Sequence, residues 1–250
     1  KEIGVEMVPF KMMVYVKEEQ QYFSIDAVSD TQTKLEVSGT ELKKRLDLDE
    51  EIPEWFSYKD VLMELKKSHP PLKERGFTVF FTGLSGSGKS TLANGLLIKL
   101  LELGNRPVTL LDGDIVRTHL SSELGFSKEH RSINIKRIGF VASEITKNRG
   151  IAVCAPIAPY ISDRDAVRDI VSAYGGFIEI HVSTPLEVCE RRDVKGLYAK
   201  ARQGIIKEFT GISDPYELPK SPEIIIDSSS DDPEILVQNI MEKIEEFGYI

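Results

Sequence analysis

The chain has 250 residues, of which 41% are apolar, and it carries a formal net charge of −8 at pH 7. This length and composition suit one large or two small domains with packed cores. No apolar run reaches the length of a membrane span, no signal-peptide leader follows Lys1, and the acidic balance disfavours a nucleic-acid surface, so we expect a cytoplasmic protein that binds neither membranes nor nucleic acids.

The N-terminal part of the chain predicts a small α+β segment. Apolar runs over 10–16 and 21–25 predict strands, and helical patterns begin near Ser38 and near Ser57. The run His69-Pro70-Pro71 then breaks any helix and predicts a linker. One face of the second helix is expected to carry Val61, Leu62 and Leu65.

After this linker, apolar runs alternate with helical patterns, which predicts a doubly wound α/β domain with a five-stranded parallel sheet. The runs are apolar almost throughout, as in strands that helices cover on both faces. The predicted strands are 77–82, 107–111, 151–155, 177–182 and 223–227. The predicted helices are 89–103, 131–149, 162–174, 186–193 and 233–247. We expect the last helix to pack on the sheet through Ile235, Leu236, Ile240 and Ile244.

Residues 83–90 match the phosphate-binding pattern G-x-x-x-x-G-K-[ST] between a predicted strand and a predicted helix. Glycines let backbone N–H groups turn toward phosphate oxygens, and the helix N-terminus adds partial positive charge. Lys89 can reach terminal phosphates, and the Ser90 hydroxyl can hold Mg²⁺. The flanking elements favour a phosphate site over an ordinary turn. The predicted ATP-binding residues are Gly83, Leu84, Ser85, Gly86, Ser87, Gly88, Lys89, Ser90 and Thr91.

Charged residues follow other predicted strands at the edge where ligands of such sheets bind. Asp112 and Asp114 end the second strand and can serve a metal and a substrate hydroxyl, although Asp-Gly-Asp also forms ordinary turns. Arg117 and Arg131 could hold a second anion, or they could be solvated surface residues. The basic stretch 189–198 is either a mobile lid or a charged helix face.

In order and spacing, these motifs closely resemble the adenylyl-sulfate kinase family over about residues 72–250. The matching pieces are 83–91, 111–114, 116–117, 124–127, 131, 134, 137–139, 193–198, 209–212 and 215–217. The resemblance implies a P-loop kinase fold that usually dimerises, so a homo-oligomer is expected. It implies that ATP phosphorylates the 3′-hydroxyl of adenosine 5′-phosphosulfate, with Mg²⁺.

The resemblance also implies residue roles. The substrate side would comprise Phe126 and Phe209, which sandwich the adenine, with Arg117, Arg131, Asn134 and Ile157. Asp114 would orient or deprotonate the hydroxyl and Asp112 would lie in the Mg²⁺ shell, although these two roles could be exchanged. Lys89 and the lid residue Lys195 would complete the catalytic set. Some relatives carry a serine, associated with a phosphoenzyme, where this chain has Ala158, so direct in-line transfer is expected.

Residues 1–68 resemble the C-terminal part of ATP sulfurylase, through 8–11, 38–42 and 52–58. The nucleotide-binding motifs of that family are absent from this stretch, so we expect a cut-away or degenerate remnant without sulfurylase activity. The expected organisation is a sulfurylase-like segment 1–68, a linker 69–76 and a kinase domain 77–250. A nucleotide-binding regulatory module without turnover is the alternative function, which the retained Asp112, Asp114 and Lys195 disfavour.

Overall fold

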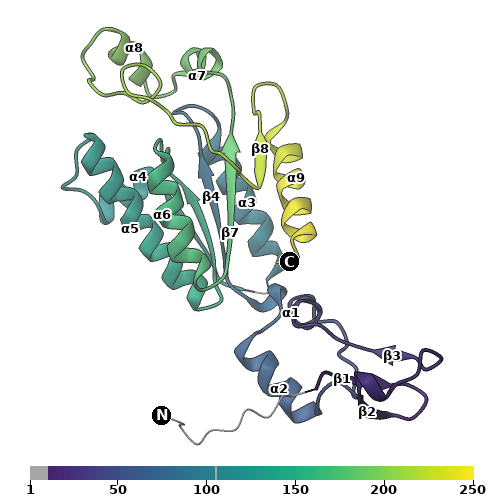
Figure 1. Ribbon diagram of the computed structural model, residues 1–250. Helices are drawn as coiled ribbons and strands as arrows, with labels where there is room; N and C mark the ends of the chain where they lie inside the picture. The colour runs from purple at the N-terminus through teal and green to yellow at the C-terminus, as the bar shows by residue number, and fades with distance from the viewer. Residues whose placement is uncertain (1–10, 105) are drawn as a thin grey trace, which may run out of the picture. The chain divides into compact units, whose positions relative to one another are not determined.

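The computed structural model describes residues 11–104 and 106–250, and the chain divides into two compact units after Pro71. Among the described residues, no helix is both long enough and apolar enough to cross a membrane. The first unit contains β1 (Met13–Val16), β2 (Gln21–Ser24), β3 (Lys34–Leu35), α1 (Gly39–Asp47) and α2 (Lys59–Ser68). The second contains β4 (Phe77–Thr82), α3 (Lys89–Leu103), β5 (Val108–Asp112), α4 (Gly113–His119), α5 (Lys128–Lys147), β6 (Ile151–Ala155), α6 (Ile161–Ser172), β7 (Gly176–Val182), α7 (Leu186–Arg192), α8 (Leu197–Arg202), β8 (Ile224–Ile226) and α9 (Pro233–Glu246) (Figure 1).

The first unit is a small antiparallel sheet, in the order β2-β1-β3, together with two helices. Its first helix begins where the Ser38 hydroxyl accepts a hydrogen bond from the Glu41 backbone N–H at 3.1 Å, as the sequence predicts. Trp55 stacks on Tyr15 with ring centroids 4.9 Å apart. The start of the strand predicted over 10–16, and most of the 8–11 motif, lie outside the described residues.

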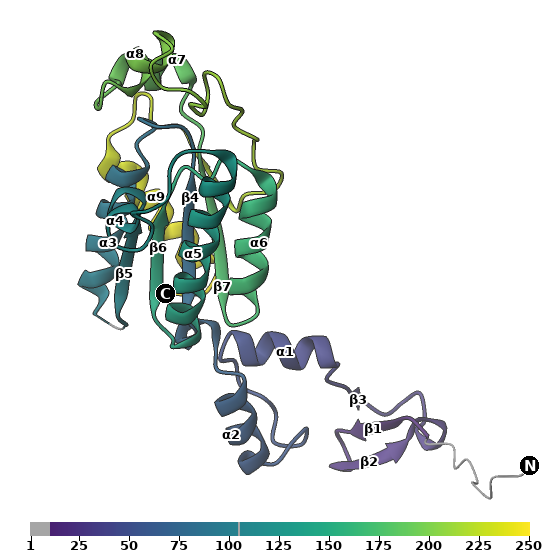
Figure 2. The same cartoon turned by 90° about the vertical axis from the view of Figure 1, so that its left-hand side faces the viewer.

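The second unit contains a parallel sheet in the order β5-β6-β4-β7-β8, which confirms the predicted α/β class. Leu92, Leu96 and Leu100 of α3 pack with α9 on one face of this sheet. Helices α4, α5 and α6 cover the other face, where Phe80 and Phe177 meet Ile138 and Val167 (Figures 1 and 2). All strands therefore end at one edge, beside α7 and α8.

The prediction that Ile235 packs on the sheet is wrong. Ile235 is 59% exposed, whereas Leu236, Ile240 and Ile244 are buried against the sheet, so the apolar stripe of α9 is narrower than predicted. Val61 of α2 is also exposed. In addition, α5 begins at Lys128 rather than at 131, because the Ser127 side chain caps the helix by accepting from the His130 backbone N–H.

The packing of α3 makes a stability prediction. Leu96→Ala should lower the free energy of unfolding by about 2–5 kcal/mol, because it leaves a cavity under the central strand. Ile98→Ala, on the exposed side of the same helix, is the matched control and should change it by less than about 0.5 kcal/mol. Chemical denaturation followed by circular dichroism is the measurement, because Trp55, the chain's single tryptophan, lies in the other unit. Equal losses in both variants would contradict this packing.

Candidate active site

The phosphate-binding loop connects the buried strand β4 to α3, as its pattern predicts. Gly83, Gly86 and Gly88 have positive φ angles of 149°, 74° and 103°. A Cβ on Gly83 would lie 2.6 Å from the backbone oxygen of Val182, so the loop also requires glycine there for space. Gly88 caps α3, and the free N–H groups of that helix's first turn face the loop. This geometry can hold an anion.

The Lys89 side chain lies inside the phosphate-binding loop. Its ammonium donates to the backbone oxygens of Gly83 at 2.9 Å and Leu84 at 2.6 Å. Burial lowers the pKa of Lys89 to about 8, although Cys189 and Asp112 act in the opposite direction. The cation is thus held where terminal phosphates would lie, but at a desolvation cost that an anionic ligand would relieve.

Asp112 and Asp114 lie at the end of β5, next to this loop. One Asp112 oxygen accepts from the Ser90 hydroxyl at 2.9 Å, and the other accepts from the backbone N–H of Asp114 at 2.9 Å, which caps α4. Asp114 is exposed, and its carboxylate forms an ion pair with Lys195. The two carboxylates therefore have different surroundings, one at the phosphate loop and one opposite the basic stretch.

The predicted acceptor residues come from α4, α5 and the loop between them. The Arg117 guanidinium lies over the Phe126 ring, 4.5 Å from its centroid, and burial lowers the pKa of Arg117. The Arg131 guanidinium is buried and donates to Asp214 at 2.6 Å and to Thr210 at 2.8 Å. Asn134 is also buried, and its Oδ1 has no hydrogen-bond partner within the protein. An unpaired buried acceptor is costly unless a ligand donates to it.

The stretch 189–198, predicted as a lid or a charged helix face, forms the end of α7, the connection 193–196 and the start of α8, and Phe209 lies in the loop after α8. Phe209 is buried edge-to-face against Tyr198, with ring centroids 5.0 Å apart. The Tyr198 hydroxyl donates to the backbone oxygen of Ser85 at 2.8 Å, so this cluster rests on the phosphate loop. Phe126, by contrast, is 65% exposed.

A single cavity of about 790 Å³ brings these groups together. The residues that the sequence predicted and that line it are Ser85, Gly86, Gly88, Lys89, Ser90, Thr91, Asp112, Asp114, Arg117, Phe126, Arg131, Asn134, Ile157, Lys195 and Phe209. Gly83, Leu84 and Ser87 do not line it. Leu84 packs in the cluster around Phe209, and the buried Ser87 accepts hydrogen bonds at its backbone oxygen from Thr184 and Ser228.

The sequence prediction missed one wall of this cavity, residues 228–231, which Arg192 of the basic stretch contacts. Arg192 donates to the Ser228 hydroxyl at 3.1 Å and to the Ser228 backbone oxygen at 2.5 Å. The 228–231 loop follows β8 at the carboxyl edge of the sheet, where ligands of parallel sheets bind. That position is the signal that could have identified it.

A parallel sheet with a phosphate-binding loop after its central strand defines the class of P-loop nucleotide-binding proteins, to which the P-loop kinases belong. The family model for adenylylsulphate kinase matches residues 75–227, and the model for ATP-sulfurylase matches residues 1–68. Because the first match spans more than half of the chain, the chain belongs to the adenylylsulphate kinase family.

Curated relatives extend the similarity over the whole chain. A sulfate adenylyltransferase of Chaetomium globosum is 46% identical over 249 residues, which are 100% of this chain and 44% of the relative. One of Mycosarcoma maydis is 49% identical over 231 residues, which are 91% of this chain and 40% of the relative. The chain thus spans less than half of the length of these relatives.

Solved structures agree with the fold. A hexameric APS kinase from Thiobacillus denitrificans has 47% identity and a TM-score of 0.82, and the match covers 100% of this chain and 45% of that one. The Mycobacterium tuberculosis APS kinase CysC, solved in complex with AMPPNP and APS, has 41% identity and a TM-score of 0.65. That match covers 68% of this chain and 98% of the other.

The lowered pKa of Lys89 makes a prediction about ATP binding. Above about pH 8 the free protein holds this lysine mostly neutral, and bound phosphates raise its pKa again, so binding takes up a proton. At about pH 8.5, calorimetry of ATP binding in buffers of different ionisation enthalpy should report uptake of most of one proton. Lys89→Met should abolish that uptake. The same uptake in both proteins would contradict the assignment to Lys89.

Proposed function

We propose that this chain transfers the γ-phosphoryl group of ATP to the 3′-hydroxyl of adenosine 5′-phosphosulfate (APS), giving 3′-phosphoadenosine 5′-phosphosulfate. The observation that carries the proposal is the single cavity, which has a phosphate loop on one wall and aromatic, cationic and amide groups on another. The relative from M. tuberculosis, solved with AMPPNP and APS, supports both substrates. The reaction would be a step of sulfate activation.

The donor half would bind the ATP phosphates through the loop N–H groups and Lys89. Ser90 and Asp112 would hold Mg²⁺, since one hydroxyl, one carboxylate and phosphate oxygens suit a cation that keeps several waters. The bound cation would neutralise charge on the transferred group.

The acceptor half would bind APS. Phe126 and Phe209 offer ring faces or edges for the adenine, and Arg117 supplies a cation beside the first of them. Arg131 is partly occupied by Asp214, so only its remaining N–H groups are available for the phosphosulfate or ribose. The unpaired Oδ1 of Asn134 would accept a hydrogen bond from the substrate.

Transfer would be direct and in line. Asp114 would orient the 3′-hydroxyl or accept its proton, because it lies between the two halves and is not bonded to Ser90. Lys195, paired with Asp114 here, would stabilise charge on the migrating phosphoryl group. At Ala158 there is no hydroxyl that could carry a phosphoryl group.

The proposal extends to organisation and partners. Residues 1–68 would be a sulfurylase-like segment, 69–76 a linker and 77–250 the kinase domain, in agreement with the family match at 1–68. We expect a cytoplasmic homo-oligomer, a dimer or a larger assembly, and the hexameric relative supports self-association. A fused or separated sulfurylase body is the expected macromolecular partner.

The first test is a coupled assay of ADP release from ATP with Mg²⁺. We expect APS to stimulate release strongly and AMP to be a poor acceptor, because the cationic acceptor wall suits the extra anionic group of APS. A nucleotide-binding module without turnover would release no ADP with either compound. Equally fast release with APS and AMP would contradict the substrate assignment.

A second test concerns stacking on Phe126. Its ring is exposed, so Phe126→Ala should change stability little, while raising the KM for APS by about 5- to 150-fold, as expected for about 1–3 kcal/mol of base stacking. The KM for ATP should stay unchanged. Tyr174→Ala is the matched control, because Tyr174 is another exposed ring under a cation, Lys147, and does not line the cavity. An unchanged KM for APS would exclude Phe126 from the site.

A further inference from the structure

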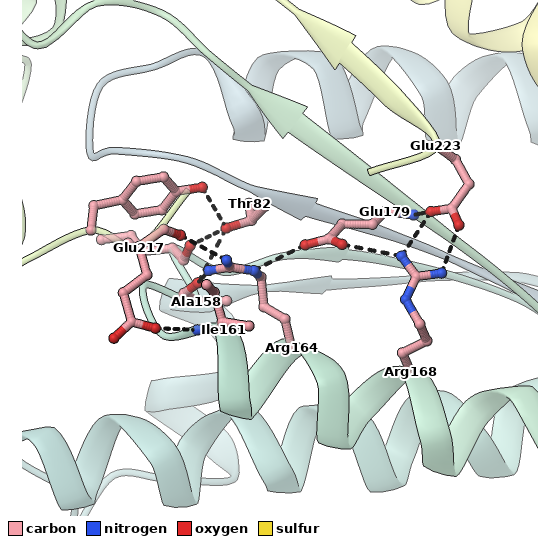
Figure 3. A network of polar contacts seen from close by, with 10 residues as sticks. Thr82, Ala158, Ile161, Arg164, Arg168, Glu179, Glu217 and Glu223 are labelled. Atoms are coloured by element: carbon pink, nitrogen blue, oxygen red, sulfur yellow. Dashed lines mark hydrogen bonds and ion pairs between the residues drawn. The ribbon is translucent and has the colours of Figure 1, made fainter. Parts of the chain in front are cut away.

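Arg164 is a buried cation that belongs to none of the motifs discussed so far and does not line the cavity. It is the fourth residue of α6 and is only 2% exposed. Figure 3 shows its guanidinium at the centre of a polar network. It donates to the backbone oxygen of Ala158 at 2.6 Å and to that of Glu217 at 2.7 Å, and its Nε lies 2.9 Å from a Glu179 carboxylate oxygen.

The first of these two backbone oxygens belongs to a wall of the cavity. Ile157, Ala158 and Pro159 all line it, and Ala158 has a φ of +46°, which L-residues rarely adopt. Such a conformation persists only where surrounding contacts hold it. The Ala158 oxygen accepts from Arg164 and, at 3.2 Å, from the hydroxyl of Thr82 at the end of β4.

The second oxygen belongs to the segment that continues from Phe209. Glu217 makes one further hydrogen bond to the same wall, from its own N–H to the Pro159 oxygen at 2.8 Å. Its carboxylate also accepts from the N–H of Ile161, the first residue of α6, at 2.7 Å. Arg164 therefore connects the 157–159 wall to the chain that follows Phe209. Both connected segments belong to the acceptor half.

A purely architectural role would make Arg164 equivalent to Arg168, one turn further along α6. Arg168 shares Glu179, at 3.1 Å, and also pairs with Glu223 at 2.6 Å (Figure 3). Within the described part of the chain, the hydrogen bonds of Arg168 reach Glu179 and Glu223 and neither the 157–159 wall nor Glu217. A comparison of Arg164 with Arg168 therefore distinguishes a role in holding the fold from a role in positioning the site.

We propose that Arg164 is a positioning residue for the acceptor half of the active site. Its planar guanidinium holds two backbone oxygens and one carboxylate in fixed directions, which a lysine ammonium does not reproduce. It thereby keeps the Ala158 turn and the segment after Phe209 in the arrangement that receives APS. This inference rests on the proposed function.

The experiment compares Arg164→Lys with Arg168→Lys in the full chain, with steady-state kinetics for both substrates and melting temperatures. Arg164→Lys should raise the KM for APS by about 10- to 100-fold, as small misplacements of a substrate do, and change the KM for ATP less than about twofold. Arg168→Lys should change neither KM. Direct APS binding in the presence of ADP should weaken in parallel in the first variant only.

A second pair keeps the test valid if Arg164→Lys does not fold. Glu217→Ala removes the acceptor of the Ile161 N–H and should raise the KM for APS, whereas Glu217→Gln keeps an acceptor there and should restore most of the affinity. The positioning role is overturned if Arg164→Lys and Arg168→Lys change the KM for APS and the KM for ATP alike. It is also overturned if neither the arginine variants nor the Glu217 variants change the KM for APS more than the KM for ATP. A wild-type chain that fails to turn over APS would instead overturn the proposed function.

Discussion

The pairing of β4 between β6 and β7 is the constraint on which the site depends. Because all three strands are parallel, the phosphate loop after β4 and the 157–159 wall after β6 lie at the same edge of the sheet. Thr82, the last residue of β4, joins them directly: its hydroxyl donates to the Ile157 oxygen at 2.7 Å and meets the Tyr216 hydroxyl at 2.9 Å. The proposed donor and acceptor halves are thus connected at the end of one strand.

The lining of the cavity does not share the acidic balance of the whole chain. The formal net charge is −8, whereas the lining places cations such as Lys89, Arg117, Arg131, Arg192 and Lys195 beside five carboxylates. Each of these cations already has internal acceptors: backbone oxygens for Lys89, Arg117 and Arg192, and carboxylates for Arg131 and Lys195. The cations are therefore oriented before an anion arrives, so little side-chain entropy remains to be lost on binding.

The sequence predicts those parts of the site that local patterns encode. The phosphate loop, the parallel strands and Asp112 follow from glycine spacing, apolar runs and strand ends. Other parts depend on contacts between residues distant in sequence, and no local pattern carries them. Examples are the Arg131–Asp214 ion pair and the Ser228 contact with the phosphate loop. The same limit explains why Ile235 is exposed although it was predicted to pack on the sheet. Helical spacing gives the direction of an apolar stripe but not its width.

The phosphate loop and Phe209 also share a small apolar core of their own. Leu84 of the loop packs with Tyr198 and Phe209, and a Cβ added to Gly211 would lie 2.9 Å from the Leu84 side chain. The Tyr198 hydroxyl bond to Ser85 fixes the same contact from the polar side. Close-packed clusters transmit displacement, because their side chains have few alternative arrangements. The phosphate loop and the ring of Phe209 are therefore connected both by the apolar contact of Leu84 and by Tyr198, which bonds Ser85 and packs against Phe209.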